Sequence, residues 1–108
     1  DIGPSEMSGL AKAIASSPTL TRLSLAKNTI GDSGAREVAA VLGRSQLQTL
    51  SLFNTGLREE AAKDFIDAIK NAPHLKKLNL QYNALRAESK KELDLANATR
   101  ESPIFLVT

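Results

Sequence analysis

The fold is decided by the stretch LTRLSLAKNTI at residues 20–30, because two close copies of it follow along the chain. The copies are LQTLSLFNTGL at residues 47–57 and LKKLNLQYNAL at residues 75–85, so the three segments begin 27 and 28 residues apart. Each reads L-x-x-L-x-L-x-x-N-x-L, except that the first segment ends in Ile30 and the middle copy has Thr55 at the asparagine position. A pattern that returns at a fixed period indicates a stack of similar structural units.

Two apolar periods alternate along the chain. Within each copy the leucines alternate with other residues, as Leu23 and Leu25 do, and this period of two predicts a short strand with its leucines on one face. Between the copies the apolar period becomes helical, with stripes formed by Met7, Leu10 and Ile14, by Ala35, Val38 and Leu42, and by Ala62, Phe65 and Ile69. We therefore predict helices at residues 5–16, 33–43, 59–71 and 87–98.

The repeats predict one domain over residues 1–108. It divides into a partial repeat (1–19), three repeats (20–46, 47–74 and 75–102) and an edge strand or start of a next repeat (103–108). The last helix is degenerate, because Lys90 and Asn97 stand where apolar residues are expected. Since no first strand or N-terminal cap precedes the first helix, we expect a piece of a longer array. Its open N-terminal end should expose Met7, Leu10 and Ile14 and favour self-association.

The repeated segment resembles the leucine-rich repeat. The period near 28, with a long amphipathic stretch in each repeat, resembles the ribonuclease-inhibitor-type subfamily, which includes sensor regions of nucleotide-binding immune receptors, tropomodulin-like proteins and the Ran GTPase-activating protein. The resemblance covers nearly the whole chain. It implies an α/β solenoid arc, with parallel strands on the concave face and helices on the convex face.

The turns and helix ends carry further expectations. The resemblance implies that the side chains of Asn28 and Asn83 bond backbone groups inside the turns that follow the strands. Thr55 has fewer donors and acceptors than an amide, so we expect a looser middle turn. Gly43 stands where the second helix should end, and Asp32 or Ser33 can cap its start.

Composition limits the classes of function. The chain has 14 basic and 12 acidic residues, and a net charge of +2 is too small to predict binding to nucleic acid or to membranes. No apolar run is long enough for a membrane-spanning helix. The absence of cysteine excludes thiolate chemistry and fits a reducing compartment, so we expect a cytoplasmic protein.

No arrangement of residues points to catalysis. The GDSG tetrapeptide at residues 31–34 resembles the surroundings of a protease nucleophile, but the single histidine, His74, offers neither a base close in sequence nor a metal site. The acidic residues of the third helix fit a solvated surface, with Glu59 and Lys63 at the spacing of a helical ion pair. We therefore expect no enzymatic activity, no cofactor and no metal.

The strand residues between the leucines should face solvent on the concave side. Phe53 and Tyr82 should be near neighbours there, and exposed aromatic side chains beside basic ones are typical of interface hot spots. We predict a partner-binding face made of Arg22, Lys27, Phe53, Asn54, Lys77, Gln81 and Tyr82. The alternative is that Phe53 packs under a neighbouring loop and Tyr82 covers the strand ends.

The function predicted from these residues is non-catalytic binding of a protein partner through the concave face. One alternative is a regulator that activates a small GTPase, for which Asn28, Arg58 and Arg86 are the candidate loop residues. A second alternative is a spacer that positions other domains of a larger protein. Fold alone does not choose among them.

Overall fold

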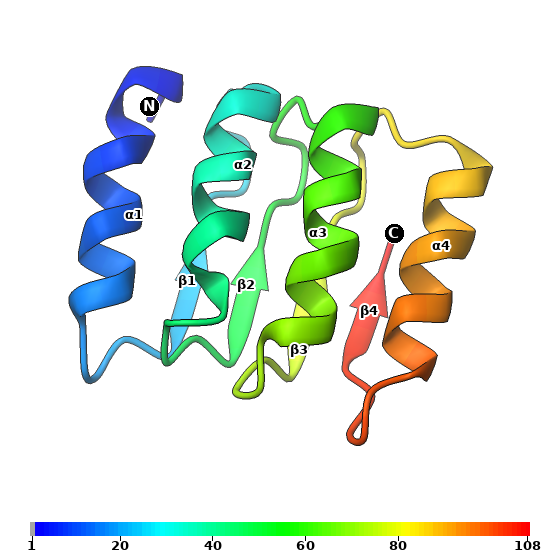
Figure 1. The fold of residues 1–108 in the computed structure, drawn as a ribbon. Helices are drawn as coiled ribbons and strands as arrows, with labels where there is room; N and C mark the ends of the chain where they lie inside the picture. Colours follow the sequence, from blue (N-terminus) through cyan, green and yellow to red (C-terminus); the bar gives the residue numbers. More distant parts are fainter. Residues whose placement is uncertain (1) are drawn as a thin grey trace.

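The computed structural model describes residues 2–108, which form a sheet of parallel strands covered on one side by a row of helices (Figure 1). The short 3₁₀ helix η1 (Pro4–Glu6) leads into the repeating units. The helices are α1 (Met7–Ser16), α2 (Gly31–Leu42), α3 (Glu59–Asn71) and α4 (Ala87–Ala98), and the strands are β1 (Arg22–Ser24), β2 (Thr49–Ser51), β3 (Lys77–Asn79) and β4 (Phe105–Val107). The α/β solenoid arc predicted from the sequence is confirmed, with strands on the concave face and helices on the convex face.

The strands pair in chain order, β1-β2-β3-β4, and every pair is parallel. Equivalent residues of successive repeats are in register, so that Leu23 pairs with Leu50 and Leu50 with Leu78. Leu106 continues this row in β4. Each strand is connected to the next through a helix, as parallel pairing requires. The register places equivalent side chains of all four strands side by side.

The core lies between the two layers. Leu25, Leu50, Leu52, Leu78 and Leu80 are no more than 1% exposed. The predicted helical stripes face these leucines, because Ala35, Val38, Leu42, Ala62, Phe65 and Ile69 are all buried. Small and large side chains thus share the narrow space between sheet and helices, which explains the abundance of both leucine and alanine.

The predicted exposure of the first helix is wrong for two of its three apolar residues. Met7 and Ile14 are fully buried, whereas Leu10 is partly buried. The physical reason is the side-by-side packing of α1 against α2, which turns the apolar stripe toward the neighbouring helix and the sheet. Met7 and Ile14 are therefore not part of an exposed apolar surface that could drive self-association.

The middle turn is closed where a looser one was expected. The Thr55 side chain is fully buried, and its hydroxyl donates to the carbonyl of Leu52 at 2.9 Å. Asn83 of the next repeat provides the missing amide, because its Nδ2 donates to the same Leu52 carbonyl at 2.8 Å. Its Oδ1 accepts from the backbone N–H groups of Thr55 and Leu57, both at 3.0 Å. One amide side chain therefore completes two turns.

The C-terminal ends of α2 and α3 are fixed by close contacts. Gly43 follows α2 as predicted, and a Cβ built on it would lie 2.8 Å from the carbonyl oxygen of Asn71, so only glycine permits this approach. At the end of α3 the guanidinium of Arg100 donates to three backbone carbonyls, those of Ile69, Ala72 and Leu75. These bonds satisfy carbonyls that the end of a helix leaves without partners.

Two carboxylates at the starts of helices accept hydrogen bonds from the next repeat and do not cap their own helix. Asp32 does not cap α2; its Oδ1 accepts from the backbone N–H of Arg58, just before α3, at 2.6 Å. Likewise Glu59 accepts from the backbone N–H of Arg86, just before α4, at 2.5 Å, and from the hydroxyl of Ser89. The predicted local cap by Asp32 or Ser33 is therefore wrong, because no side chain within residues 2–108 caps α2. The predicted ion pair between Glu59 and Lys63 is not found among the described residues, where Glu59 is paired with Arg86.

The Glu59 carboxylate should make stability depend on pH. The hydroxyl of Ser89 and the N–H of Arg86 lower the pKa of Glu59 below its usual value, because both donate to the charged form. A lowered folded-state pKa adds stability above the unfolded-state pKa, and this stability is lost as the pH falls through the folded-state value. We expect Glu59→Gln to lower the urea midpoint at about pH 7, and the difference to be lost at an acidic pH below the lowered folded-state pKa. Glu60→Gln, at a more exposed carboxylate, is the control and should leave the midpoint unchanged at both pH values.

Candidate partner-binding face

The candidate face is the side of the sheet that the helices leave uncovered. Its first row is formed by Arg22, Thr49, Lys77 and Phe105, which lie in register across the four strands. Its second row is formed by Ser24, Ser51, Asn79 and Val107. Neighbouring strands lie about 4.8 Å apart, so each row spans roughly 14 Å. We call this surface, together with residues 26–27, 53–54 and 81–82 beyond the strand ends, the concave face.

Three of the predicted site residues share an unusual backbone conformation. Lys27, Asn54 and Tyr82 have positive φ angles of 66°, 53° and 58°, and each directly precedes the asparagine or threonine of its turn. The left-handed conformation ends the strand alternation, so these side chains project into solvent and do not continue the buried leucine face. Asparagine tolerates this conformation, whereas lysine and tyrosine adopt it at a cost of roughly 1 kcal/mol each.

Phe53 and Tyr82 contact each other, as the sequence predicted. Their ring centroids are 4.9 Å apart and the rings are tilted by 58°, which is a favourable geometry for an aromatic pair. Phe53 is partly buried, but Tyr82 is 75% exposed. The alternative in which Tyr82 only covers the strand ends therefore does not explain why most of this ring is exposed.

The remaining predicted residues lie on the same face. Arg22, Lys27, Asn54 and Lys77 are exposed, and Gln81 is partly buried. The backbone N–H of Asn54 donates to the carbonyl of Gln81 at 2.9 Å, and that of Lys27 donates to the carbonyl of Phe53 at 2.9 Å. The predicted residues are thus joined from repeat to repeat by the bonds that extend the sheet.

Phe105 is a residue of this face that sequence reasoning did not select. It is 63% exposed, and Nζ of Lys77 lies 5.4 Å from the centre of its ring, which is cation–π distance. The repeat spacing contained the signal, because 28 residues beyond Lys77 is Phe105. The sequence predicted a strand at residues 103–108, but the register of the repeats was not extended to this strand. The exposed ring of Phe105 was therefore not predicted.

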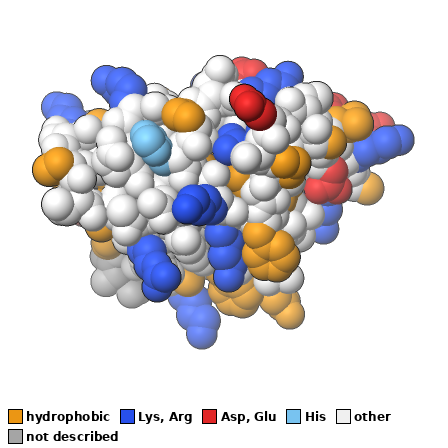
Figure 2. All heavy atoms as spheres, turned by 90° about the horizontal axis from the view of Figure 1, so that it is seen from below, with side chains coloured by type: hydrophobic (Ala, Val, Ile, Leu, Met, Phe, Trp, Pro, Cys, Tyr) orange, Lys and Arg blue, Asp and Glu red, His pale blue; other side chains and the backbone are white. Residues whose placement is uncertain are grey.

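The surface seen from below joins basic and hydrophobic side chains. In Figure 2 the lower part of the view shows lysine, arginine and hydrophobic side chains. The acidic side chains that are visible in this view lie in its upper and right-hand parts. The ion pairs among the described residues involve Arg36 and Arg86, and none of them involves Arg22, Lys27 or Lys77. The basic groups of the concave face are therefore not neutralised by carboxylates within residues 2–108.

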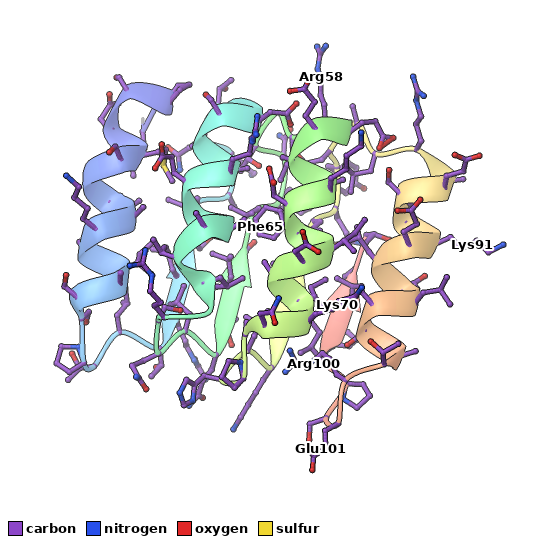
Figure 3. All side chains as sticks on the ribbon, in the orientation of Figure 1. Arg58, Phe65, Lys70, Lys91, Arg100 and Glu101 are labelled. Atoms are coloured by element: carbon purple, nitrogen blue, oxygen red, sulfur yellow. The ribbon has the colours of Figure 1, made fainter. Side chains whose placement is uncertain are left out.

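The residues considered for GTPase activation lie elsewhere. The Asn28 amide donates to the carbonyls of Leu25 and Ala26, at 3.1 and 3.4 Å, and is part of its turn. Arg58 projects from the beginning of α3 (Figure 3). Arg58 and Arg86 border a shallow depression of about 460 Å³ that also contains the carboxylates of Asp32, Glu59 and Glu60.

Comparison with known families agrees with the geometry. The family described as Leucine Rich repeat matches residues 16–39 and 71–89. These ranges contain β1 and β3 with the turns of Asn28 and Asn83, whereas the middle repeat with Thr55 lies outside them. The chain is therefore similar to leucine-rich repeat proteins over these two ranges, and the described strand–helix units repeat the same arrangement between them.

Proposed function

We propose that this protein is a non-catalytic interaction module that binds a protein partner through its concave face. Leucine-rich repeat domains generally mediate protein–protein interaction, and this supports an interaction role for the chain. The choice of the concave face rests on its side chains: the exposed ring of Tyr82 in contact with Phe53, a second exposed aromatic ring at Phe105, and unneutralised basic groups. Aromatic and arginine side chains at the centre of a surface are typical binding hot spots.

The exposed ring and left-handed backbone of Tyr82 are the main support for the proposal. A large aromatic side chain that is 75% exposed gains little from folding, and its left-handed backbone costs free energy. The equivalent position of the middle repeat holds Asn54, which adopts the same conformation with less strain. The backbone conformation alone therefore favours asparagine at position 82. Binding supplies a reason for tyrosine, because a partner would bury the exposed ring.

The two alternatives fit these residues less well. GTPase activation would rely on Arg58 and Arg86, but three carboxylates share their depression and would repel the phosphates of a bound nucleotide. Asn28 is committed to its turn. A spacer role requires neither an exposed aromatic pair nor an exposed tyrosine in a strained conformation. We also propose, from the absence of cysteine, that the protein works in a reducing compartment such as the cytoplasm.

Tyr82→Asn separates binding from folding. We expect this change to alter the free energy of unfolding by less than about 1 kcal/mol, because relief of the left-handed strain offsets the lost contact with Phe53. We expect it to weaken partner binding about tenfold or more, because the exposed ring is lost. The measurement is affinity capture from a lysate of the cells that express the protein. Calorimetric titration of the purified captured protein against wild type and variant then follows.

Leu95→Asn is the matched control. Leu95 lies on α4 and is 59% exposed, so the same kind of change removes an apolar side chain from the convex surface. The control should retain the captured protein with unchanged affinity. Equal capture by wild type and Tyr82→Asn would contradict the concave site and favour the spacer. A captured small GTPase whose hydrolysis is accelerated, with Arg58→Ala abolishing the effect, would favour the regulator.

A further inference from the structure

The two faces of the protein differ in the sign of their charges. Within residues 2–108 every aspartate and glutamate lies on a helix, except Glu101 in the loop before β4. The three segments that form the strands and turns, residues 17–30, 43–58 and 72–86, contain no acidic residue. Their basic residues are Arg22, Lys27, Arg44, Arg58, Lys76, Lys77 and Arg86. Arg22, Lys27 and Lys77 of this set lie on the concave face, so a net charge of +2 for the whole chain conceals a basic concave face and a row of helices rich in acidic residues.

The side chains of the concave face form a shallow track between two borders. The middle row contains short polar side chains, and the oxygens of Ser24, Ser51 and Asn79 each accept a backbone N–H two residues further on. One border is the row with Arg22, Lys77 and Phe105, and the other holds Lys27 with the Phe53–Tyr82 pair. Both borders thus combine positive charge with an exposed aromatic ring.

We infer that the concave face binds an acidic protein segment that carries an apolar side chain among its carboxylates. This inference rests on the proposed function and adds the chemistry of the partner. An extended segment lying on the short middle row directs successive side chains to opposite borders. Its carboxylates can pair with Arg22, Lys27 or Lys77, and its apolar side chain can cover Tyr82 or Phe105. Charge complementarity of this kind sets both the association rate and the choice of partner.

An acidic protein segment fits better than a nucleic acid or an anionic membrane. The face spans only roughly 14 Å across its four strands, which suits a few residues of peptide. A long polyanion or a membrane surface would also meet the field of the acidic helices, and the net charge of +2 offers little long-range attraction. The Phe53 and Tyr82 rings are tilted by 58° and contact each other, so they do not form parallel platforms for successive bases.

The test uses synthetic peptides, and it benefits from the absence of tryptophan in the protein. One peptide has a single tryptophan flanked by two glutamates on each side, and the second has glutamine at those four places. Peptide fluorescence then reports binding directly. At about 50 mM salt we expect the acidic peptide to bind at least about tenfold more tightly than the glutamine peptide, and the preference to disappear near 0.5 M salt.

Two charge reversals locate the binding. Lys77→Glu should remove the preference for the acidic peptide, because it reverses a charge on one border of the concave face. Lys91→Glu makes the same change in net charge on α4, where the side chain points outward (Figure 3), and should alter affinity less than about twofold. Far-ultraviolet circular dichroism checks both folds, and Arg22→Glu replaces Lys77→Glu if that variant is unfolded.

Each other outcome has a defined meaning. Equal affinity for the two peptides, with both lost in Tyr82→Asn, overturns the acidic partner and leaves the concave site standing. No saturable peptide binding up to about 1 mM overturns the acidic partner, and if Tyr82→Asn still captures its protein the concave site fails as well. Tighter binding of an eight-nucleotide oligo-thymidine or of phosphatidylserine vesicles than of the acidic peptide overturns the inference in favour of that polyanion.

Discussion

Replacing Phe65 with alanine is expected to lower the free energy of unfolding by about 3–5 kcal/mol, because it removes the largest fully buried side chain of the core. Phe65 belongs to α3, which packs against both α2 and α4, so the cavity lies where two helix contacts meet. Domains of this size are stable by only about 5–15 kcal/mol. The variant should therefore be close to unfolding at 37 °C.

Urea denaturation followed by circular dichroism measures this loss. Phe65→Leu serves as the graded control and should cost about 1–2 kcal/mol, since leucine refills most of the space. Lys70→Ala, at an exposed position of the same helix, should change the midpoint little. A loss below about 1 kcal/mol for Phe65→Ala would contradict the placement of this ring at the centre of the core.

Asn83→Ala is expected to lower the free energy of unfolding by about 2–4 kcal/mol, although asparagine is polar and only partly buried. Its Oδ1 accepts from the N–H groups of Thr55 and Leu57, and its Nδ2 donates to the carbonyls of Leu52 and Leu80. Alanine leaves the N–H groups of Thr55 and Leu57 and the carbonyl of Leu80 without these partners, whereas the Leu52 carbonyl keeps its bond from the Thr55 hydroxyl. Each buried backbone group without a partner costs about 1–3 kcal/mol.

Asn28→Ala is the comparison. Its Oδ1 accepts from one backbone group, the N–H of Ile2, and its Nδ2 donates to carbonyls of its own turn only. We expect its loss to be about 1–2 kcal/mol, roughly half of that for Asn83→Ala. Hydrogen exchange adds a local measurement, because the amides of Thr55 and Leu57 should exchange faster in Asn83→Ala alone. Equal losses in the two variants would show that the bonds between repeats add nothing.

Much of the fold follows from local periodicity. Alternating leucines place one face of each strand in the core, and this requirement is met within a few residues of sequence. The stripes around Val38 and Phe65 fix the helices in the same way, so α3 and α4 begin and end where predicted, and α2 begins two residues earlier. Sequence reasoning failed where a side chain bonds another repeat. Asp32 has the position of a local cap, but its partner is 26 residues away.

The sequence predicted most residues of the candidate site, but not the backbone conformation of Tyr82 or the position of Phe105. Spacing alone brings Phe53 and Tyr82 together, because equivalent strand positions are neighbours in a parallel stack. Spacing does not indicate that the backbone of Tyr82 is left-handed, since tyrosine has no preference for that conformation. Phe105 was missed because the last strand lacks the full repeated pattern, and only its pairing with Lys77 reveals which way the ring points.

The bonds between repeats also bear on how such a chain changes length during evolution. A protein without residues 47–74 would bring Asp32 opposite the backbone N–H of Arg86, because Arg86 has the place in its repeat that Arg58 has in the preceding one. Asn83 would likewise meet the turn of Asn28. Donors and acceptors would find equivalent partners, while Phe53 would leave the concave face. Gain or loss of a whole repeat by in-frame recombination can thus redraw the recognition surface while the scaffold persists.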